Sequence, residues 1–207
     1  MRKTLRRETI INMIKTNQGI REQGIKRNET KNMILCAMFV TLIAVGAFIK
    51  IPIPVVPFTL QYLFTMLAGL LLGGKLGALA VCVYILLGLA GVPVFAQGGG
   101  IGYIFQPSFG YIIGFAAGAY VTGVIANGKA NPGYPRLLAA NFIGLGIVYL
   151  FGMVYYYMIS KFYLGTPIGF WPLFLYCFLL AVPGDIVLCI FGAVLGKRMI
   201  PVCQKIG

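Results

Sequence analysis

The chain has 207 residues, of which 59% are hydrophobic and 10% are charged, and its mean hydropathy is +0.90. These values exclude an ordinary soluble domain, in which charged residues make up about a quarter of the sequence. The formal net charge of +13 at pH 7 raises the question of a nucleic-acid partner, which the positions of the basic residues answer below.

The first 32 residues form a polar, basic segment that contains nine of the 17 Lys and Arg residues. Ile10, Met13 and Ile14 have helical spacing between basic residues, which suits a short helix lying on anionic lipid. Gly19 and Gly24 interrupt that pattern and favour a disordered basic tail instead. We therefore divide the chain into a basic N-terminal tail, residues 1–32, and a membrane-embedded domain, residues 33–207.

The membrane-embedded domain contains six apolar runs separated by Gly, Pro and polar breaks. About 20 mostly apolar residues cross a hydrocarbon core roughly 30 Å thick, so this length accommodates six spans with short loops. The sequence predicts an all-α, polytopic membrane protein with helices at Met33–Ile49, Leu60–Gly73, Leu76–Ala90, Phe109–Ala126, Leu137–Met158 and Pro172–Gly196.

Six spans place both termini on one side of the membrane, and the basic residues then divide very unevenly. Fifteen of the 17 fall on the side of the termini, and only Lys50 and Lys161 fall on the other. The positive-inside rule therefore predicts cytoplasmic termini in a multi-pass protein of the cell membrane. The same distribution attributes the charge to membrane topology and lipid, so we expect no nucleic-acid partner.

Asp185 is the one acidic residue outside the N-terminal tail, and it lies within the last apolar run. Burying an isolated carboxylate at this depth of the membrane costs roughly several kcal/mol of free energy, unless the group is hydrogen-bonded or faces water. Pro183 and Gly184 precede it, and broken helices are tolerated where they line a cavity. These features favour a substrate contact, with a structural hydrogen-bond acceptor as the alternative.

A glycine-rich stretch, Val92–Ser108, lies on the side opposite the termini. It has neither the Lys-Ser/Thr pair nor the preceding strand of a phosphate loop. We predict a compact loop that folds over a binding site, with apolar walls from Phe95 and Tyr103 and hydrogen bonds from Gln97 and Gln106.

Two further polar side chains, Gln61 and Asn141, lie within apolar runs. Each either joins helices by hydrogen bonding or contacts a ligand. The sequence contains no His, no paired carboxylates and no nucleotide-binding loop, so we expect neither an enzyme nor a metal or cofactor site.

Several motifs, in the expected order, resemble the BioY family of biotin-specific S components of energy-coupling factor transporters. The motifs are Val56–Gln61, Leu67–Gly73, Leu87–Phe95, Pro107–Phe115 and Pro183-Gly184-Asp185. The resemblance covers about residues 33–196 and leaves the basic tail outside.

The resemblance implies a six-helix subunit that binds biotin from outside and associates with a transmembrane coupling (T) protein and a pair of cytoplasmic ATPases. It also implies that Asp185 contacts the ureido ring and that Ala37 and Thr41 face the coupling protein. The chain departs from many family members at Leu188, where they have Lys, and at Gln106, where some have Arg. Backbone N–H groups of Gly98–Gly102 could take over the binding of the carboxylate.

Two alternatives accompany the biotin hypothesis. The first is an S component for another small vitamin, which the two departures allow. The second is a structural or assembly membrane protein whose polar residues only join helices.

Overall fold

The computed structural model describes residues 28–51, 58–129, 131–165 and 168–206. The chain divides into two units, Met1–Leu35 and Cys36–Gly207. The described residues of the first unit, 28–35, are helical, and most of the predicted basic tail lies outside the described residues. The second unit contains all of the features considered below.

The elements after the first helix are β1 (Lys50–Ile51), β2 (Phe58–Thr59), α2 (Gln61–Leu72), α3 (Gly74–Leu89), the 3-10 helix η1 (Ile101–Phe105), α4 (Phe109–Asn127), α5 (Tyr134–Phe162), α6 (Phe170–Phe174), the π-helix η2 (Leu175–Leu179) and α7 (Val182–Ile206). Helices therefore dominate the described chain, as the sequence predicts.

Four helical segments are long and apolar enough to cross a membrane. They are Asn28–Phe48, Phe109–Asn127, Tyr134–Phe162 and Trp171–Cys203. The helices α2 and α3 are apolar but shorter. The prediction of a polytopic helical membrane protein is confirmed, whereas the count of six spans depends on how these two short helices are placed.

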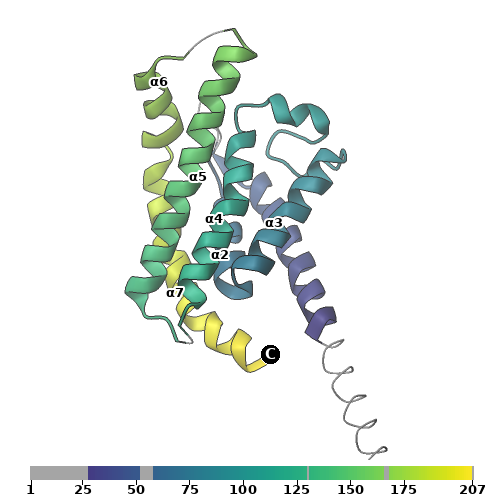
Figure 1. The fold of residues 1–207 in the computed structure, drawn as a ribbon, viewed down its shortest axis with the longest axis vertical. Helices are drawn as coiled ribbons and strands as arrows, with labels where there is room; N and C mark the ends of the chain where they lie inside the picture. Colours follow the sequence, from purple (N-terminus) through teal and green to yellow (C-terminus); the bar gives the residue numbers. More distant parts are fainter. Residues whose placement is uncertain (1–27, 52–57, 130, 166–167, 207) are drawn as a thin grey trace, which may run out of the picture. The chain divides into compact units, whose positions relative to one another are not determined.

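Helix α4 lies between α3 and α5 in the second unit (Figure 1). A Cβ atom at Gly114 would come within 2.9 Å of the Val148 Cα, and one at Gly118 within 3.1 Å of the Gly144 carbonyl oxygen. Gly114 and Gly118 therefore allow close approach of the α5 backbone to α4.

The junction between α2 and α3 is a tight turn. Gly73 separates the two helices and has a φ of 83°, a left-handed conformation that glycine adopts without a Cβ penalty. The Asn127 side chain at the end of α4 donates hydrogen bonds to the Leu70 and Gly123 carbonyl oxygens, at 3.1 and 3.0 Å. This turn and the end of α4 therefore lie at the same end of the helices.

Three predicted helix boundaries are wrong, each because the helix continues into polar sequence. The first helix is already present at Asn28, the first described residue, and Asn28–Asn32 contains neither Gly nor Pro. Helix α5 begins at Tyr134, because Pro135 occupies its first turn, where a missing N–H costs nothing. Helix α7 continues to Ile206, since the Lys197 ammonium reaches the Asn131 side chain and the Pro132 carbonyl oxygen, both at 3.0 Å.

A short antiparallel strand pair connects the first helix to α2. Lys50 pairs with Thr59, and Ile51 pairs with Phe58. Residues 52–57, between the two strands, lie outside the described residues. The strand pair places Phe58 and Thr59 immediately before α2.

Candidate functional site

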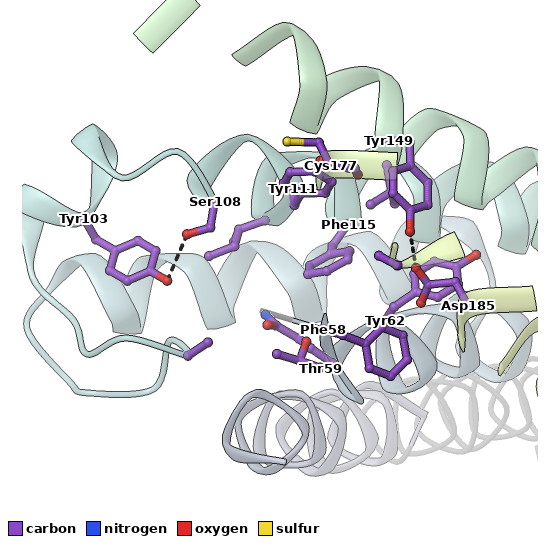
Figure 2. Close-up of a pocket in the computed structure, with 15 residues that line it drawn as sticks. Phe58, Thr59, Tyr62, Tyr103, Ser108, Tyr111, Phe115, Tyr149, Cys177 and Asp185 are labelled. Carbon is purple, nitrogen blue, oxygen red and sulfur yellow. Dashed lines mark hydrogen bonds between the residues drawn. The ribbon is translucent and has the colours of Figure 1, made fainter. Parts of the chain in front are cut away.

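A cavity of about 70 Å³ lies within the second unit (Figure 2). This volume is several times the roughly 10–15 Å³ that a single water molecule requires. The strand pair, the glycine-rich loop and the helices α2, α4, α5 and α7 all contribute to its walls. The lining residues are Phe58, Thr59, Gln61, Tyr62, Ala96, Tyr103, Ser108, Tyr111, Ile112, Phe115, Val148, Tyr149, Cys177, Ala181 and Asp185.

Asp185 reaches the cavity because the last membrane segment is interrupted. Its α-helix changes to the π-helix η2, turns at Leu180 and Ala181, and resumes as α7. Asp185 lies in the first turn of α7, where the helix dipole stabilises negative charge. The predicted break beside Pro183 and Gly184 is therefore present, and it faces a cavity.

The Asp185 carboxylate is buried, with 8% of the residue exposed. The Tyr149 hydroxyl donates a hydrogen bond of 2.5 Å to its Oδ2 atom, a length typical of an O–H donor bound to a carboxylate (Figure 2). Among the described residues no cation forms an ion pair with it. Asp185 is therefore held in place by a neutral donor and keeps capacity to accept further hydrogen bonds.

The break also brings an aromatic side chain against α7. A Cβ atom at Gly184 would lie 2.7 Å from the Phe58 ring, so only glycine leaves room for this contact. Phe58 lines the cavity. The Pro183-Gly184-Asp185 motif thus positions both an apolar wall and the carboxylate.

Tyrosine hydroxyls around the cavity are bound to backbone carbonyl groups. The Tyr111 hydroxyl donates to the Cys177 carbonyl oxygen at 2.9 Å, and the Tyr62 hydroxyl donates to that of Asn141 at 2.8 Å. The Tyr111 and Tyr149 rings meet edge to face, with their centroids 6.0 Å apart. These rings form fixed apolar walls suited to a flat ligand.

The glycine-rich loop folds back onto α3. The Gly100 N–H donates to the Gly88 carbonyl oxygen at 2.7 Å, and Phe95 packs against Tyr84 and Tyr103. The Tyr103 hydroxyl lies 3.3 Å from the Ser108 hydroxyl, and burial raises the pKa of Tyr103, so its phenol stays protonated. We call residues 92–108 the cap, because Ala96, Tyr103 and Ser108 close one side of the cavity.

Gln61 is the second strongly polar side chain in the cavity wall. Only 3% of the residue is exposed, and its Nε2 atom has no hydrogen-bond partner among the described residues. An unpaired buried amide donor costs about 1–3 kcal/mol, so a ligand acceptor here would recover this free energy.

The predicted site residues thus fall into two groups. Asp185, Gln61 and Tyr103 line the cavity, whereas the others do not, and contact of these three with a substrate stays a prediction. Phe95 is buried behind Tyr103, and the Asn141 amide donates to the Cys189 carbonyl oxygen at 2.8 Å, which joins α5 to α7. Gln97 and Gln106 are exposed on the cap, and their contact with a ligand stays a prediction.

Unlike Tyr103, the other three tyrosines of the cavity wall were not indicated by the sequence. Tyr62, Tyr111 and Tyr149 belong to apolar helices, where tyrosine is also common for reasons of membrane depth. In the structure, a Cβ atom at Gly152 would overlap the Tyr111 ring, so this glycine makes room for the tyrosine.

The apolar helices and the cavity between them define a polytopic membrane protein with an internal cavity lined by aromatic and polar side chains. The BioY family model matches residues 15–205, and the chain belongs to the BioY family. The match also extends into the predicted tail, beyond the 33–196 range that the motifs cover.

Several relatives agree with this assignment. A probable biotin transporter BioY of Lysinibacillus sphaericus is 44% identical over 87% of this chain and 92% of its own. The biotin transporter BioY of Thermotoga maritima is 44% identical over 59% of this chain and 72% of its own. These relatives are transporters, in agreement with the expectation that the chain is not an enzyme.

A solved structure has the same fold. The crystal structure of the S component for biotin from an ECF-type ABC transporter matches with a TM-score of 0.69 and 26% identity, over 84% of this chain and 92% of the other. The fold that surrounds the cavity is therefore that of a substrate-binding transport subunit.

Proposed function

We propose that this chain is the biotin-binding S component of an energy-coupling factor importer in the cell membrane. The observation that carries the proposal is the buried Asp185 carboxylate, held by Tyr149 in the wall of an aromatic cavity. The 44% identical biotin transporter and the matching S component for biotin support the choice of ligand.

The chemistry of the cavity suits the ring system of biotin. Its ureido group presents N–H donors and one carbonyl acceptor, and its fused sulfur ring is apolar. Asp185 would accept from the ureido N–H groups in charge-assisted hydrogen bonds. Gln61 Nε2, which has no partner among the described residues, would donate to the ureido oxygen. Phe58, Tyr62 and Phe115 would contact the apolar faces.

The proposal includes six spans with cytoplasmic termini. Basic residues of the second unit support this topology because they share one end of the unit, as the contacts of Asn127 and Lys197 given above indicate. They are Lys75 and Arg136 in the first turns of α3 and α5, Lys129 just after α4, and Lys197 and Arg198 in the C-terminal half of α7. Lys50 and Lys161 lie at the cap end. The positive-inside rule then places the cap and the cavity entrance outside.

Helices α2 and α3 would be the two short spans. Helix α2 has 12 residues and is therefore about 18 Å long, less than the hydrocarbon core of roughly 30 Å. The cap and the strand pair would occupy the remaining depth on the outer side, where irregular backbone is tolerated beside a cavity.

Energy would come from a coupling (T) protein and two ATPases. Ala37 and Thr41 are both exposed on the first helix, and the Thr41 hydroxyl donates to the Ala37 carbonyl oxygen at 3.1 Å. This hydrogen bond satisfies the hydroxyl within its own helix. The small surface that remains would admit a helix of the coupling protein closely.

Binding of labelled biotin to the detergent-purified chain tests the proposal. Asp185→Asn keeps the shape and removes the charge, and hydrogen bonds to charged groups are worth about 1.5–3 kcal/mol, so affinity should fall roughly 10- to 100-fold. Thr122→Val is the control, because Thr122 is buried and its hydroxyl binds the Ala140 carbonyl oxygen away from the cavity.

Two results would contradict the proposal. Equal biotin affinity in the wild type and Asp185→Asn would place the site elsewhere. Thermal stabilisation by another vitamin but not by biotin would change the substrate, since a ligand at 100 times its dissociation constant adds about 2.7 kcal/mol of stability. A structural protein would be stabilised by neither.

A further inference from the structure

Lys50 lies between two segments that line the cavity. Its backbone pairs with Thr59 in the strand pair, and its ammonium group donates to the Ala96 carbonyl oxygen at 2.7 Å. Thr59 and Ala96 are both lining residues. These two contacts place the ammonium where the strand pair meets the cap, at the edge of the cavity.

The proposed ligand carries a negative charge, and no cation is among the residues that line the described cavity. Biotin ends in a carboxylate that is ionised at neutral pH. Asp185 is the charged residue among those that line the described cavity, and its sign is the same as that of the ligand. A second anion in an enclosed site is unfavourable unless a cation or several N–H donors compensate it.

The other described cations are poorly placed for this role. The Lys161 ammonium lies over the rings of Tyr157 and Phe162, 5.9 and 5.5 Å from their centroids, at the end of α5. The remaining basic side chains of the second unit's described helices and loops belong to the opposite end, as the contacts of Asn127 and Lys197 indicate.

We propose that the Lys50 ammonium binds the carboxylate of the ligand. This inference rests on the proposed function, and it orients the ligand with its ureido ring at Asp185 and its acid group at the edge between strand pair and cap. An ammonium group has three N–H donors, and the hydrogen bond to Ala96 uses one of them. The same side chain would therefore join the cap to the bound ligand and select acids over neutral analogues.

The test compares two ligands and three variants of the purified full chain. The ligands are biotin and biotinamide, in which a neutral amide replaces the carboxylate. Lys50→Met removes the charge and keeps a long side chain, Lys50→Arg keeps the charge, and Lys161→Met removes the other cation of the cap end. Equilibrium binding of both ligands is measured for each protein.

The proposal predicts a selective effect. Lys50→Met should weaken biotin about 10-fold or more, the scale of one charge-assisted hydrogen bond, and change biotinamide less than about 3-fold. Lys50→Arg should retain most of the affinity, and Lys161→Met should resemble the wild type. Retained biotinamide binding also shows that Lys50→Met is folded.

Three results would overturn the inference. An equal loss for biotin and biotinamide would assign Lys50 to holding the cap through Ala96. Unchanged binding of both ligands would place the carboxylate elsewhere. Failure of the wild type to bind biotin would reject the proposed function as well. The wild type is measured first, so this outcome is distinguished from an effect of the Lys50 variants.

Discussion

The Tyr149 hydroxyl on α5 and the Asp185 carboxylate on α7 form a buried hydrogen bond of 2.5 Å across the cavity wall. This bond fixes the orientation of the carboxylate at the point where the last membrane segment is interrupted. It also joins two helices whose packing shapes the cavity. A ligand that binds Asp185 therefore meets a carboxylate that is already oriented, which lowers the entropic cost of binding.

The first prediction removes this hydrogen bond. Tyr149→Phe keeps the ring and its edge-to-face contact with Tyr111, whereas Asp185 loses its donor. We expect biotin affinity to fall about 10-fold, because a hydrogen bond to a charged group contributes roughly 1.5–3 kcal/mol. Calorimetric titration of the purified variant measures the change.

Tyr156→Phe is the matched control for Tyr149→Phe. Tyr156 is buried on the same helix and is not one of the residues that line the cavity. Its variant should bind biotin with the affinity of the wild type. An equal loss in both variants would mean that the effect arises from α5 packing and not from the carboxylate.

The second prediction concerns the space beside Tyr111. A Cβ atom at Gly152 would overlap the Tyr111 ring, so Gly152→Ala should move this ring toward the cavity. Overpacking of this kind costs about 1–3 kcal/mol, and we expect a lower midpoint of thermal unfolding together with weaker biotin binding.

Gly146→Ala on the same helix is the control for Gly152→Ala. Nothing lies within 4 Å of a Cβ atom at Gly146, so alanine should be neutral there or stabilise the helix by about 0.5–1 kcal/mol. If both alanine variants had the wild-type midpoint of thermal unfolding, the close approach of the Tyr111 ring to Gly152 would be contradicted.

The sequence predicted the fold best where Gly and Pro mark the ends of apolar runs. The bounds of α2, α3 and α4 agree with prediction within two residues, because Gly73 and the cap interrupt the apolar pattern clearly. Helices α5 and α7 are longer than predicted, since Tyr134, Lys161 and Lys197 extend them beyond the apolar stretch. Polarity marks the edge of the membrane and not the end of a helix.

Of the cavity lining, the sequence indicated two polar residues and Tyr103 of the cap. Asp185 and Gln61 stand out in apolar runs because a buried polar group is costly. Tyr62, Tyr111 and Tyr149 do not stand out: the chain has 12 tyrosines, and neither residue type nor spacing separates a cavity wall from a membrane-interface position within an apolar helix. Lys50 was assigned only to topology, because its contact with Ala96 joins residues that are distant in the sequence.

The third prediction concerns the backbone of the cap. Gly100 has a φ of 102°, a backbone conformation that costs a residue with a side chain about 1–3 kcal/mol. Its N–H donates a hydrogen bond to the Gly88 carbonyl oxygen. Gly100→Ala should loosen the cap and increase the dissociation rate of labelled biotin. Gly102→Ala in the same loop should leave the rate unchanged, because Gly102 lacks a positive φ and has nothing within 4 Å of its Cβ position. If biotin dissociated at the same rate from both variants, the cap would have no role in retaining the ligand.

The last prediction tests the surface proposed for the coupling protein. Ala37 is exposed on the first helix, and a bulky side chain there would prevent close approach of another helix. Ala37→Trp should therefore abolish co-purification with the coupling protein and the ATPases, while biotin binding by the isolated chain stays unchanged, since Ala37 does not line the cavity. Ile190→Trp introduces the same side chain on the exposed face of α7, where 50% of Ile190 is exposed, and should leave the complex intact.

Two results would contradict this assignment of the surface. Loss of the complex in both variants would show that tryptophan disturbs assembly regardless of its position. An intact complex with Ala37→Trp would mean that the coupling protein contacts another face of the chain.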